Sequence, residues 1–411
     1  MSPAPGLAAS FRHGIHPEEH KEATEHSAVA RMPFVERYVL PLSQHTGAAC
    51  KPVVRPGERV VRGQVVAEPG GFVSTTLHSP VTGRVAAIGP RPHPAGKLVE
   101  AIEIEADPFS PQMVEGRLPA VDWRTCSDEE FVAHVQRAGI VGMGGAAFPS
   151  HVKYKLPEGR VIERLVVNGC ECEPFLTADH RVMVERPEAV LRGARIVGAR
   201  LGVREIAIGV ELNKPDAIEA LSRALKQPVP PLDRVPAGAE VGGRRRPLPP
   251  RGGERVGVRG VLPDSIPIRV VPLKVKYTQG AEKMLLRALY GLEVPSGKLP
   301  LDVGCVVNNV ATMVAVADAF DARLPMLERV VTVAGPGVRR PANLLVPVGT
   351  PVRAVLDHCG GLAAETREVV MGGPMMGMPL ASLDVPVLKG TSGLLAFTDA
   401  EARVPVEYAC I

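Results

Sequence analysis

The chain has 411 residues, of which 45% are hydrophobic and 22% are charged, and its formal net charge is +4. This length predicts roughly two to four domains with ample cores, and the small net charge argues against nucleic acid as a main partner. The sequence has no run of about eighteen apolar residues and no secretion signal, so we expect no transmembrane helix and seven reduced cysteines.

Residues 1–34 are polar and irregular, and we interpret them as an N-terminal extension. His16 and His20 lie four positions apart, a spacing that could place two zinc ligands on one face of a helix. Because no third ligand lies nearby, a solvated segment is the favoured interpretation.

Residues 35–106 are expected to form a compact β unit. Short apolar runs are separated by turn glycines in residues 53–64 and again in residues 78–85, which predicts a small barrel or sandwich. The pattern is similar to lipoyl-type and biotinyl-type domains, which hold their cofactor on a lysine. No lysine occurs between Lys51 and Lys97, so we expect a carrier-type fold without a carried group.

Residues 127–322 are expected to form an α/β domain with one insertion. Helix and strand patterns alternate along this region, and such alternation predicts a parallel sheet covered by helices. The predicted helices are residues 128–138 before Gly139, residues 215–225, and a helix that ends at Tyr290 before Gly291. The predicted strands are residues 161–167, 205–210, 268–273 and 305–307.

A glycine-rich loop follows the first of these helices. Free backbone N–H groups in such a loop can form an anion site, and a lysine one or two turns further on can pair with a phosphate. The loop has neither the Gly-Lys-Ser/Thr of a Walker loop nor the spacing of a dinucleotide fingerprint, so a tight structural turn is an equal alternative. Its residues are Gly142, Met143, Gly144, Gly145, Ala146, Ala147, Phe148 and Pro149, with Lys153 following.

Polar clusters follow three of the predicted strands, in residues 168–174, 277–283 and 308–312. Because ligands bind at the carboxyl ends of parallel strands, we expect these clusters to meet in one site. Helix capping explains Asn309 well, but it explains a tyrosine, a glutamate and paired asparagines on one edge less well. The C-x-C of residues 170–172 is interpreted as buried small residues, since metal sites usually need two such pairs.

The remaining segments are an insertion and a second β unit. Residues 227–266 hold seven Arg against four Asp and Glu and are rich in Pro and Gly, so we expect a surface insertion that buries no core. Residues 328–380 are expected to form a β-grasp-like unit, followed by a C-terminal segment, 381–411. Its predicted strands are residues 330–334 and 344–348, with a helix at 352–358; the glycine-rich turns 371–377 and 389–393 are expected to be structural.

The α/β domain resembles a known flavoprotein. The glycine-rich loop with Phe148, Pro149 and Lys153, followed by Asn168 and two glutamates, is similar to the flavin-binding loop of the NADH-oxidising subunit of respiratory complex I. That subunit has an arginine in the loop where this chain has Met143, which removes one candidate contact to a phosphate or nucleotide.

A closer resemblance is to RnfC, the peripheral subunit of the Rnf ion-translocating ferredoxin:NAD oxidoreductase. Residues 138–145 and 177–181 are typical of that family, and the resemblance covers residues 14–411. It implies a multidomain α/β and β fold. The domains would be an N-terminal lipoyl-like barrel-sandwich hybrid, a complex-I-flavoprotein-like FMN-binding domain, and a soluble-ligand-binding β-grasp (SLBB-like) domain.

The resemblance also implies a cofactor, a substrate and their ligands. Flavin accepts hydride from the nicotinamide of NADH and releases electrons singly, while the protein supplies binding and orientation. Glu171 and Glu173 would contact the flavin ring and the nicotinamide. FMN and the nucleotide would be held by Gly142, Gly144, Gly145, Ala147, Phe148, Lys153, Asn168, Tyr277, Glu282, Asn308, Asn309 and Thr312.

The C-terminal residues resemble the start of a ferredoxin-type domain, which holds [4Fe–4S] clusters through four thiolates each. Cys410 would be the first ligand of such a cluster, and its other ligands are absent from the sequence. We therefore expect this chain to be a fragment or a truncated product, with clusters only in the missing domain.

The implied function is that of a peripheral electron-transfer subunit of an Rnf-type membrane complex, an FMN-dependent NADH dehydrogenase module of a translocase. Its partners would be the other Rnf subunits, membrane-embedded and ferredoxin-like, and indirectly ferredoxin. Its place would be the cytoplasmic side of the bacterial plasma membrane. The alternatives are the related NqrA-like quinone reductase subunit and a non-catalytic scaffold without cofactors.

Overall fold

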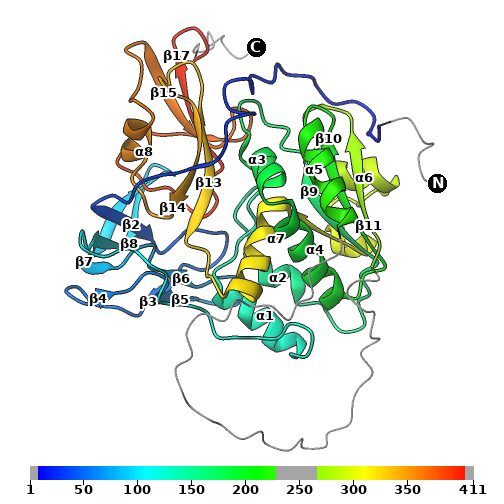
Figure 1. The fold of residues 1–411 in the computed structure, drawn as a ribbon, viewed down its shortest axis with the longest axis horizontal. Coiled ribbons are helices and arrows are strands. Elements are labelled where there is room, and N and C mark those ends of the chain that lie inside the picture. Colours follow the sequence, from blue (N-terminus) through cyan, green and yellow to red (C-terminus); the bar gives the residue numbers. More distant parts are fainter. Residues whose placement is uncertain (1–7, 228–265, 403–411) are drawn as a thin grey trace, which may run out of the picture.

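The computed structural model describes residues 8–227 and 266–402, which form three folded units. An antiparallel β unit and a mixed β unit lie on one side of the molecule, and an α/β unit lies on the other (Figure 1). Most of the predicted insertion 227–266 and the predicted cluster ligand Cys410 lie outside the described residues.

The antiparallel β unit consists of two sheets around one apolar core. Side chains alternate between core and solvent, as on β8, where Ile102 and Ile104 are buried and Glu105 is exposed. The predicted barrel-sandwich hybrid is therefore confirmed. The first sheet contains β2 (Arg37–Pro41), β8 (Lys97–Ala106), β7 (Gly83–His93) and β4 (Arg59–Val60), and the second contains β3 (Lys51–Pro52), β5 (Val65–Glu68) and β6 (Leu77–His78).

The α/β unit is built on a four-stranded parallel sheet, as predicted, with the strand order β11-β10-β9-β12. Strand β9 begins at Arg164 rather than at Val161, whose side chain is 68% exposed, and it continues to Gly169. The strands are β9 (Arg164–Gly169), β10 (Glu205–Glu211), β11 (Ile268–Leu273) and β12 (Cys305–Asn309).

Helices cover both faces of this sheet (Figure 1). Leu165 and Val167 of β9 face the larger core under α4 and α7, whereas Val166 between them faces α6. This alternation is why the strand is apolar throughout. The helices are α1 (Asp128–Arg137), α2 (Ser150–Tyr154), α3 (Ala178–Glu185), α4 (Pro187–Leu201), α5 (Pro215–Lys226), α6 (Glu282–Tyr290) and α7 (Val310–Ala317).

The mixed β unit is the β-grasp, with one helix, α8 (Val352–His358), against its sheet. β13 and β17 run parallel at the centre, and β17 comes from the segment 381–411. The strand order is β1 (Ala30–Arg31), β14 (Ala342–Pro347), β13 (Glu328–Ala334), β17 (Gly393–Thr398), β15 (Thr366–Met371) and β16 (Met378–Pro379).

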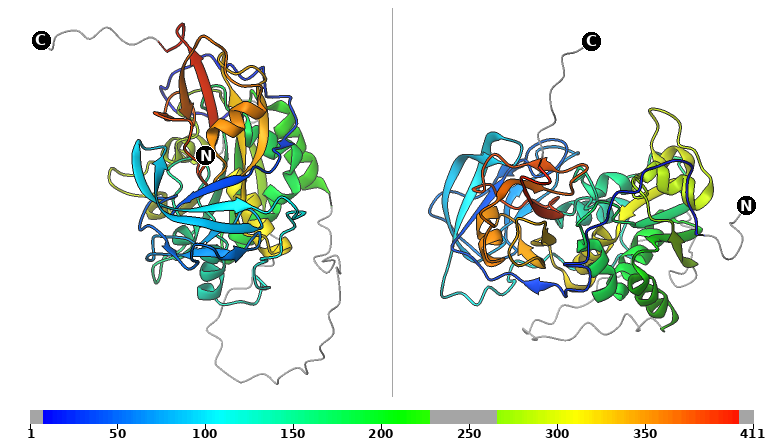
Figure 2. Two further views of the ribbon diagram at one scale, coloured as in Figure 1. Left: turned by 90° about the vertical axis from the view of Figure 1, so that its left-hand side faces the viewer. Right: turned by 90° about the horizontal axis from the view of Figure 1, so that it is seen from above.

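The N-terminal extension connects the units across the top of the molecule (Figure 2, right). Ala9 pairs with Leu273 at the end of β11, and Ile15 pairs with Tyr277 just beyond it. The extension then reaches the β-grasp sheet, where β1 pairs with β14. The segment therefore passes along the edge of the sheet at which the predicted site residues lie.

Candidate functional site

The predicted site residues meet at the carboxyl ends of β9 and β12. The two strands are neighbours, and Asn309 lies opposite Asn168 in their register. Ligands of parallel α/β sheets bind at this edge, because loops rather than helices begin there. The glycine-rich loop and the turn after β11 close on the same edge, as the following contacts show.

The glycine-rich loop is a closed turn with an exposed tip. Val141 and Pro149 form a bridge, and the Gly142 N–H donates to the Phe148 carbonyl at 2.8 Å. Gly144, Gly145 and Ala146 are exposed at the tip. The tip therefore presents backbone, rather than large side chains, to the solvent.

The base of the loop is held by residues from two other elements. The Met143 N–H donates to Thr312 Oγ1 of α7 at 3.1 Å, and Arg329 Nη2 of β13 donates to the Met143 carbonyl at 3.4 Å. The Met143 side chain is 5% exposed and packs in the core. Met143 thus points away from the exposed tip, and the position that differs from complex I is used here for packing.

The two tip glycines have different surroundings. A Cβ built on Gly144 would lie 3.0 Å from Asn309 Nδ2, so a side chain there would press on Asn309. A Cβ built on Gly145 meets no described atom within 4 Å, and Gly145 has no positive φ. The described protein therefore does not itself require glycine at position 145, and the space beside it is free for a ligand.

Asn309 has two roles. Its Oδ1 accepts the Ala311 N–H at 2.8 Å, which is the predicted cap of α7, and its Nδ2 donates to Asp179 Oδ2 at 2.5 Å. Burial, with the neighbouring Glu171 carboxylate, raises the pKa of Asp179 to about 7, and the buried Arg329 opposes this shift. A polar network therefore lies directly beneath the loop.

Lys153 joins α2 to two other site elements. Its Nζ donates to Glu282 Oε1 at 2.6 Å and to the Val307 carbonyl at 2.9 Å. Asn308, 4% exposed, accepts a hydrogen bond from Tyr154 at 3.2 Å, while its Nδ2 has no partner among the described residues. A buried amide with a free donor is costly unless a ligand or water completes it.

The turn after β11 is tied to the loop after β9. Asn168 Nδ2 donates to the Gly280 carbonyl at 2.7 Å, and the Gly280 N–H donates to Cys172 Sγ at 3.4 Å. These bonds place Tyr277 and Glu282 beside the 168–174 loop. The predicted convergence of the three polar clusters is therefore observed.

The two glutamates of this loop are used differently. Both carboxylate oxygens of Glu171 accept N–H groups at the start of α3, from Asp179 at 2.7 Å and His180 at 3.0 Å. Glu173 accepts the Met375 N–H at 2.9 Å, and its buried Oε1 is without a partner in the described chain. Burial raises the pKa of Glu173. Of the two, Glu173 is the one with a free oxygen.

The cysteines show no metal centre in the described parts of the chain. No group of three or more Cys, His, Asp or Glu residues there is arranged to hold an ion. Cys170 is fully buried, and burial raises the pKa of Cys172 to about 11, so its thiol is protonated at neutral pH. Both observations agree with the structural interpretation of the C-x-C pair.

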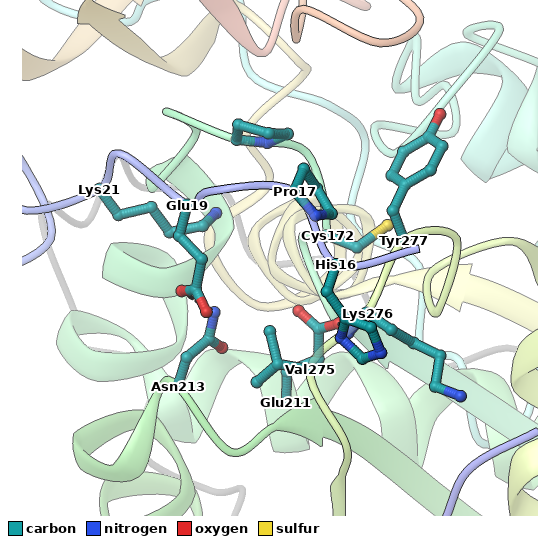
Figure 3. Close-up of a pocket in the computed structure, with 11 residues that line it drawn as sticks. His16, Pro17, Glu19, Lys21, Cys172, Glu211, Asn213, Val275, Lys276 and Tyr277 are labelled. Carbon is teal, nitrogen blue, oxygen red and sulfur yellow. Dashed lines mark hydrogen bonds between the residues drawn. The ribbon is translucent and has the colours of Figure 1, made fainter. Parts of the chain in front are cut away.

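A cavity of about 150 Å³ opens beside the 171–174 loop (Figure 3). Its lining includes Lys21, Glu19 and His16 from the N-terminal extension, together with Cys172 and Tyr277. Sequence patterns did not identify Lys21, Arg329 or Met375 as site residues. Each reaches the site from a segment that carries no ligand-binding pattern of its own.

Models of three protein families match the chain: the Nuo51 FMN-binding domain at residues 135–318, the RnfC barrel sandwich hybrid domain at residues 9–108 and the SLBB domain at residues 330–379. The RnfC-type subunit of the proton-translocating ferredoxin:NAD(+) oxidoreductase complex of Clostridium ljungdahlii is 38% identical over 405 residues, covering 98% of this chain and 80% of that protein. The RnfC-type subunit of the ion-translocating oxidoreductase complex of Rhodobacter capsulatus is 40% identical over 404 residues, covering 98% and 70%.

A solved structure of an NAD+-reducing [NiFe]-hydrogenase in the H2-reduced state has the same fold over part of the chain. The match has a TM-score of 0.50 and 19% identity, and it covers 68% of this chain and 48% of that one. At this identity the likeness concerns the fold alone.

The fold and the site define a protein of the complex I flavoprotein type, with an FMN-binding domain between a barrel-sandwich hybrid and an SLBB domain. The chain belongs to the RnfC family, whose members are subunits of ion-translocating oxidoreductase complexes. It is an electron-transfer subunit of such a complex, and the other subunits are its partners. No helix within residues 8–227 and 266–402 is long and apolar enough to cross a membrane.

Proposed function

We propose that this chain binds FMN at the carboxyl edge of β9 and β12 and transfers electrons between NAD(H) and the iron–sulfur centres of an Rnf-type complex. The observation that carries the proposal is the exposed glycine tip of the 142–149 loop, which lies against Asn309 at the end of β12. A site of this kind suits a phosphorylated, planar, polar ligand.

The residues present fit FMN. The tip of the loop offers backbone N–H groups, the space beside Gly145 is free, and Lys153 supplies a cation within the same site. Asn308 Nδ2 and Glu173 Oε1 are buried polar atoms with no described partner. FMN would be held by the loop, Lys153 and the asparagines that end β12, and bound FMN supplies the exchange between two-electron and one-electron chemistry.

The chain's own contribution is orientation and electrostatics. Lys153 would neutralise phosphate charge, with Glu282 fixing the lysine side chain. Glu173 would accept a hydrogen bond from the nicotinamide through its free Oε1, and Tyr277 would border the same space. Glu171 would support this arrangement from behind, because its carboxylate caps α3.

The relatives' names point to the wider complex. They describe ferredoxin:NAD(+) oxidoreductase complexes that translocate protons or Na(+) ions. We infer the same ferredoxin and NAD(+) partners for this chain, with the subunit peripheral on the cytoplasmic face of the membrane. Clusters would be supplied by a domain that begins near Cys410.

The test is to titrate FMN into the purified chain and follow quenching of flavin fluorescence, then to add NADH without oxygen and follow bleaching of the flavin absorbance. We expect stoichiometric binding and reduction by NADH. Bleaching without FMN, or no FMN binding, contradicts the proposal. Binding without reduction would leave an FMN-binding subunit that does not oxidise NADH.

A further inference from the structure

Lys21 is a buried cation that does not form a direct ion pair in the described chain. It lies in the N-terminal extension, is 4% exposed, and its Nζ donates to the carbonyls of Glu171 at 2.9 Å and Glu173 at 3.0 Å. It makes a third, short hydrogen bond to the Leu176 carbonyl. All three donors of one ammonium group therefore point at one loop, the 171–176 loop.

This loop has an unusual backbone that needs external support. Glu171 has φ 48° and Phe175 has φ 65°, both in the left-handed region that residues other than glycine seldom adopt. Three carbonyls that converge on one point also repel one another unless a cation lies between them. Lys21 satisfies that requirement from a segment about 150 residues away in sequence.

We propose that Lys21 is a positioning residue, an internal cation that holds the 171–176 loop and thereby sets the Glu173 carboxylate at the site. The backbone carbonyl of Glu173 is held by Lys21, and its side chain is held by the Met375 N–H. The effect on the cofactor site rests on the function proposed above. The effect on the loop does not, because it concerns only the described contacts.

The charge state of Lys21 suits this role at neutral pH. Burial, with the nearby Lys214, lowers the pKa of Lys21 to about 8, while Glu171, Glu211 and Glu19 oppose the shift. The three carbonyls favour the charged form further, because they accept hydrogen bonds best from an ammonium group. At pH 7 the group is therefore charged, and the tests below are set at that pH.

The structure offers a chemical rescue. Lys21 lines the cavity shown in Figure 3, so truncation to alanine would enlarge a space that already opens at the surface. An ethylammonium ion carries three N–H donors and could re-occupy the carbonyl cluster. Tetramethylammonium has the same charge but no N–H donor, so it serves as the matched control ion.

The experiment measures amide hydrogen exchange across residues 171–177 of the Lys21→Ala chain at pH 7, without FMN. We expect exchange to be faster by about tenfold or more, since hydrogen bonds to a charged group are among the stronger ones, and to slow again with ethylammonium but not with tetramethylammonium. In the FMN-loaded protein, we expect the rate of reduction by NADH to fall by roughly tenfold to a hundredfold and to recover with the same ion.

Lys276 provides the matched protein control. It lines the same cavity, and its Nζ donates to the carbonyls of Phe11 and His13 at 2.8 and 2.9 Å, away from the 171–176 loop. We expect Lys276→Ala to leave exchange across residues 171–177 unchanged. If it accelerates exchange there as much as Lys21→Ala does, the effect is general loosening of the extension and the proposal is wrong.

The remaining outcomes also decide. Unchanged exchange in the Lys21→Ala chain, or equal rescue by both ions, overturns the proposal. If that chain does not fold, Lys21→Met keeps the apolar stem and removes only the donors, and faster exchange across residues 171–177 is again the expected result. Altered exchange in a chain whose wild type binds no FMN would support the positioning role while rejecting the proposed function, so the two failures are distinguishable.

Discussion

The Met375 N–H donates a hydrogen bond to Glu173 Oε2 at 2.9 Å, so the β-grasp domain reaches the loop that follows β9 of the α/β domain. The approach is close. A Cβ built on Gly373, two residues before Met375, would lie 2.2 Å from the same oxygen and 2.5 Å from the Glu173 carboxyl carbon. The turn at 372–377 thus forms one wall of the site, and glycine at 373 is what allows the contact.

Gly373→Ala is expected to displace the Glu173 side chain, because a methyl group cannot occupy that space. We expect the rate of flavin reduction by NADH to fall by roughly tenfold or more and FMN affinity to change much less, since Glu173 is assigned to the nicotinamide side. Stopped-flow absorbance and a flavin titration measure the two effects. Met376→Ala, at a side chain 78% exposed in the same turn, is the control, and equal losses in both variants would contradict the assignment.

Gly145→Val is expected to abolish FMN binding without unfolding the domain. No described atom lies within 4 Å of a Cβ at this position, so the cost of the side chain arises only when a ligand occupies the space. Gly89 in the barrel-sandwich unit is equally open and also has no positive φ, which makes Gly89→Val the matched control. FMN affinity equal to wild type in the Gly145→Val chain would show that the ligand does not approach the loop tip.

Lys153 and Glu282 are expected to act on FMN as a pair. Their ion pair is partly exposed, with side chains 25% and 43% accessible, so its loss should change stability by only about 0–1 kcal/mol. Lys153→Met should weaken FMN binding about tenfold, because a cation near the phosphate is lost. Adding Glu282→Gln to that variant should then have little further effect, and strictly additive losses in FMN affinity would argue that the two side chains act separately.

Asp179 is expected to make stability fall as the pH rises. Its pKa is raised to about 7 in the folded chain, so between about pH 4 and pH 7 the folded state binds more protons than the unfolded state. This contribution is fully present below about pH 4 and is lost as the pH rises through about 7. Asp179→Asn should remove the slope, so that the difference in unfolding free energy between variant and wild type grows by on the order of 1–3 kcal/mol over this range.

The measurement uses Trp123, the single tryptophan of the chain, which is 3% exposed in the core of the α/β unit. Urea unfolding followed by its fluorescence reports on this unit. A pH-independent difference between the two proteins would mean that Asp179 titrates normally in the folded chain.

The insertion is expected to be dispensable for folding and for FMN binding. The sequence prediction covers residues 227–266, but Ile266 is 5% exposed and packs in the large core, so the replacement by a short Gly/Ser linker should span residues 228–265. We expect unchanged Trp123 fluorescence and unchanged FMN affinity. Loss of either in the shortened chain would show that the segment is structural.

Local patterns were sufficient for the elements and for most of the site. Apolar spacing predicted the helix now seen as α5 and the strand now seen as β11, and the glycine after Tyr290 has the left-handed conformation that ends α6. The polar clusters could be grouped in advance because parallel strands of one sheet present their carboxyl ends to the same edge. Asn168, Glu282 and Asn309 were all found in this way.

The support of the site depends on contacts between domains, which no local pattern records. Lys21 meets Glu171 across 150 residues, Arg329 meets Met143 across 186, and Met375 meets Glu173 across 202. A lysine, an arginine and a backbone N–H have no periodicity that marks their targets; packing of the three units decides which carbonyl or carboxylate each one reaches. The same packing assigns Glu171 to the end of α3 and leaves Glu173 with a free oxygen, although the two glutamates are nearly equivalent in the sequence.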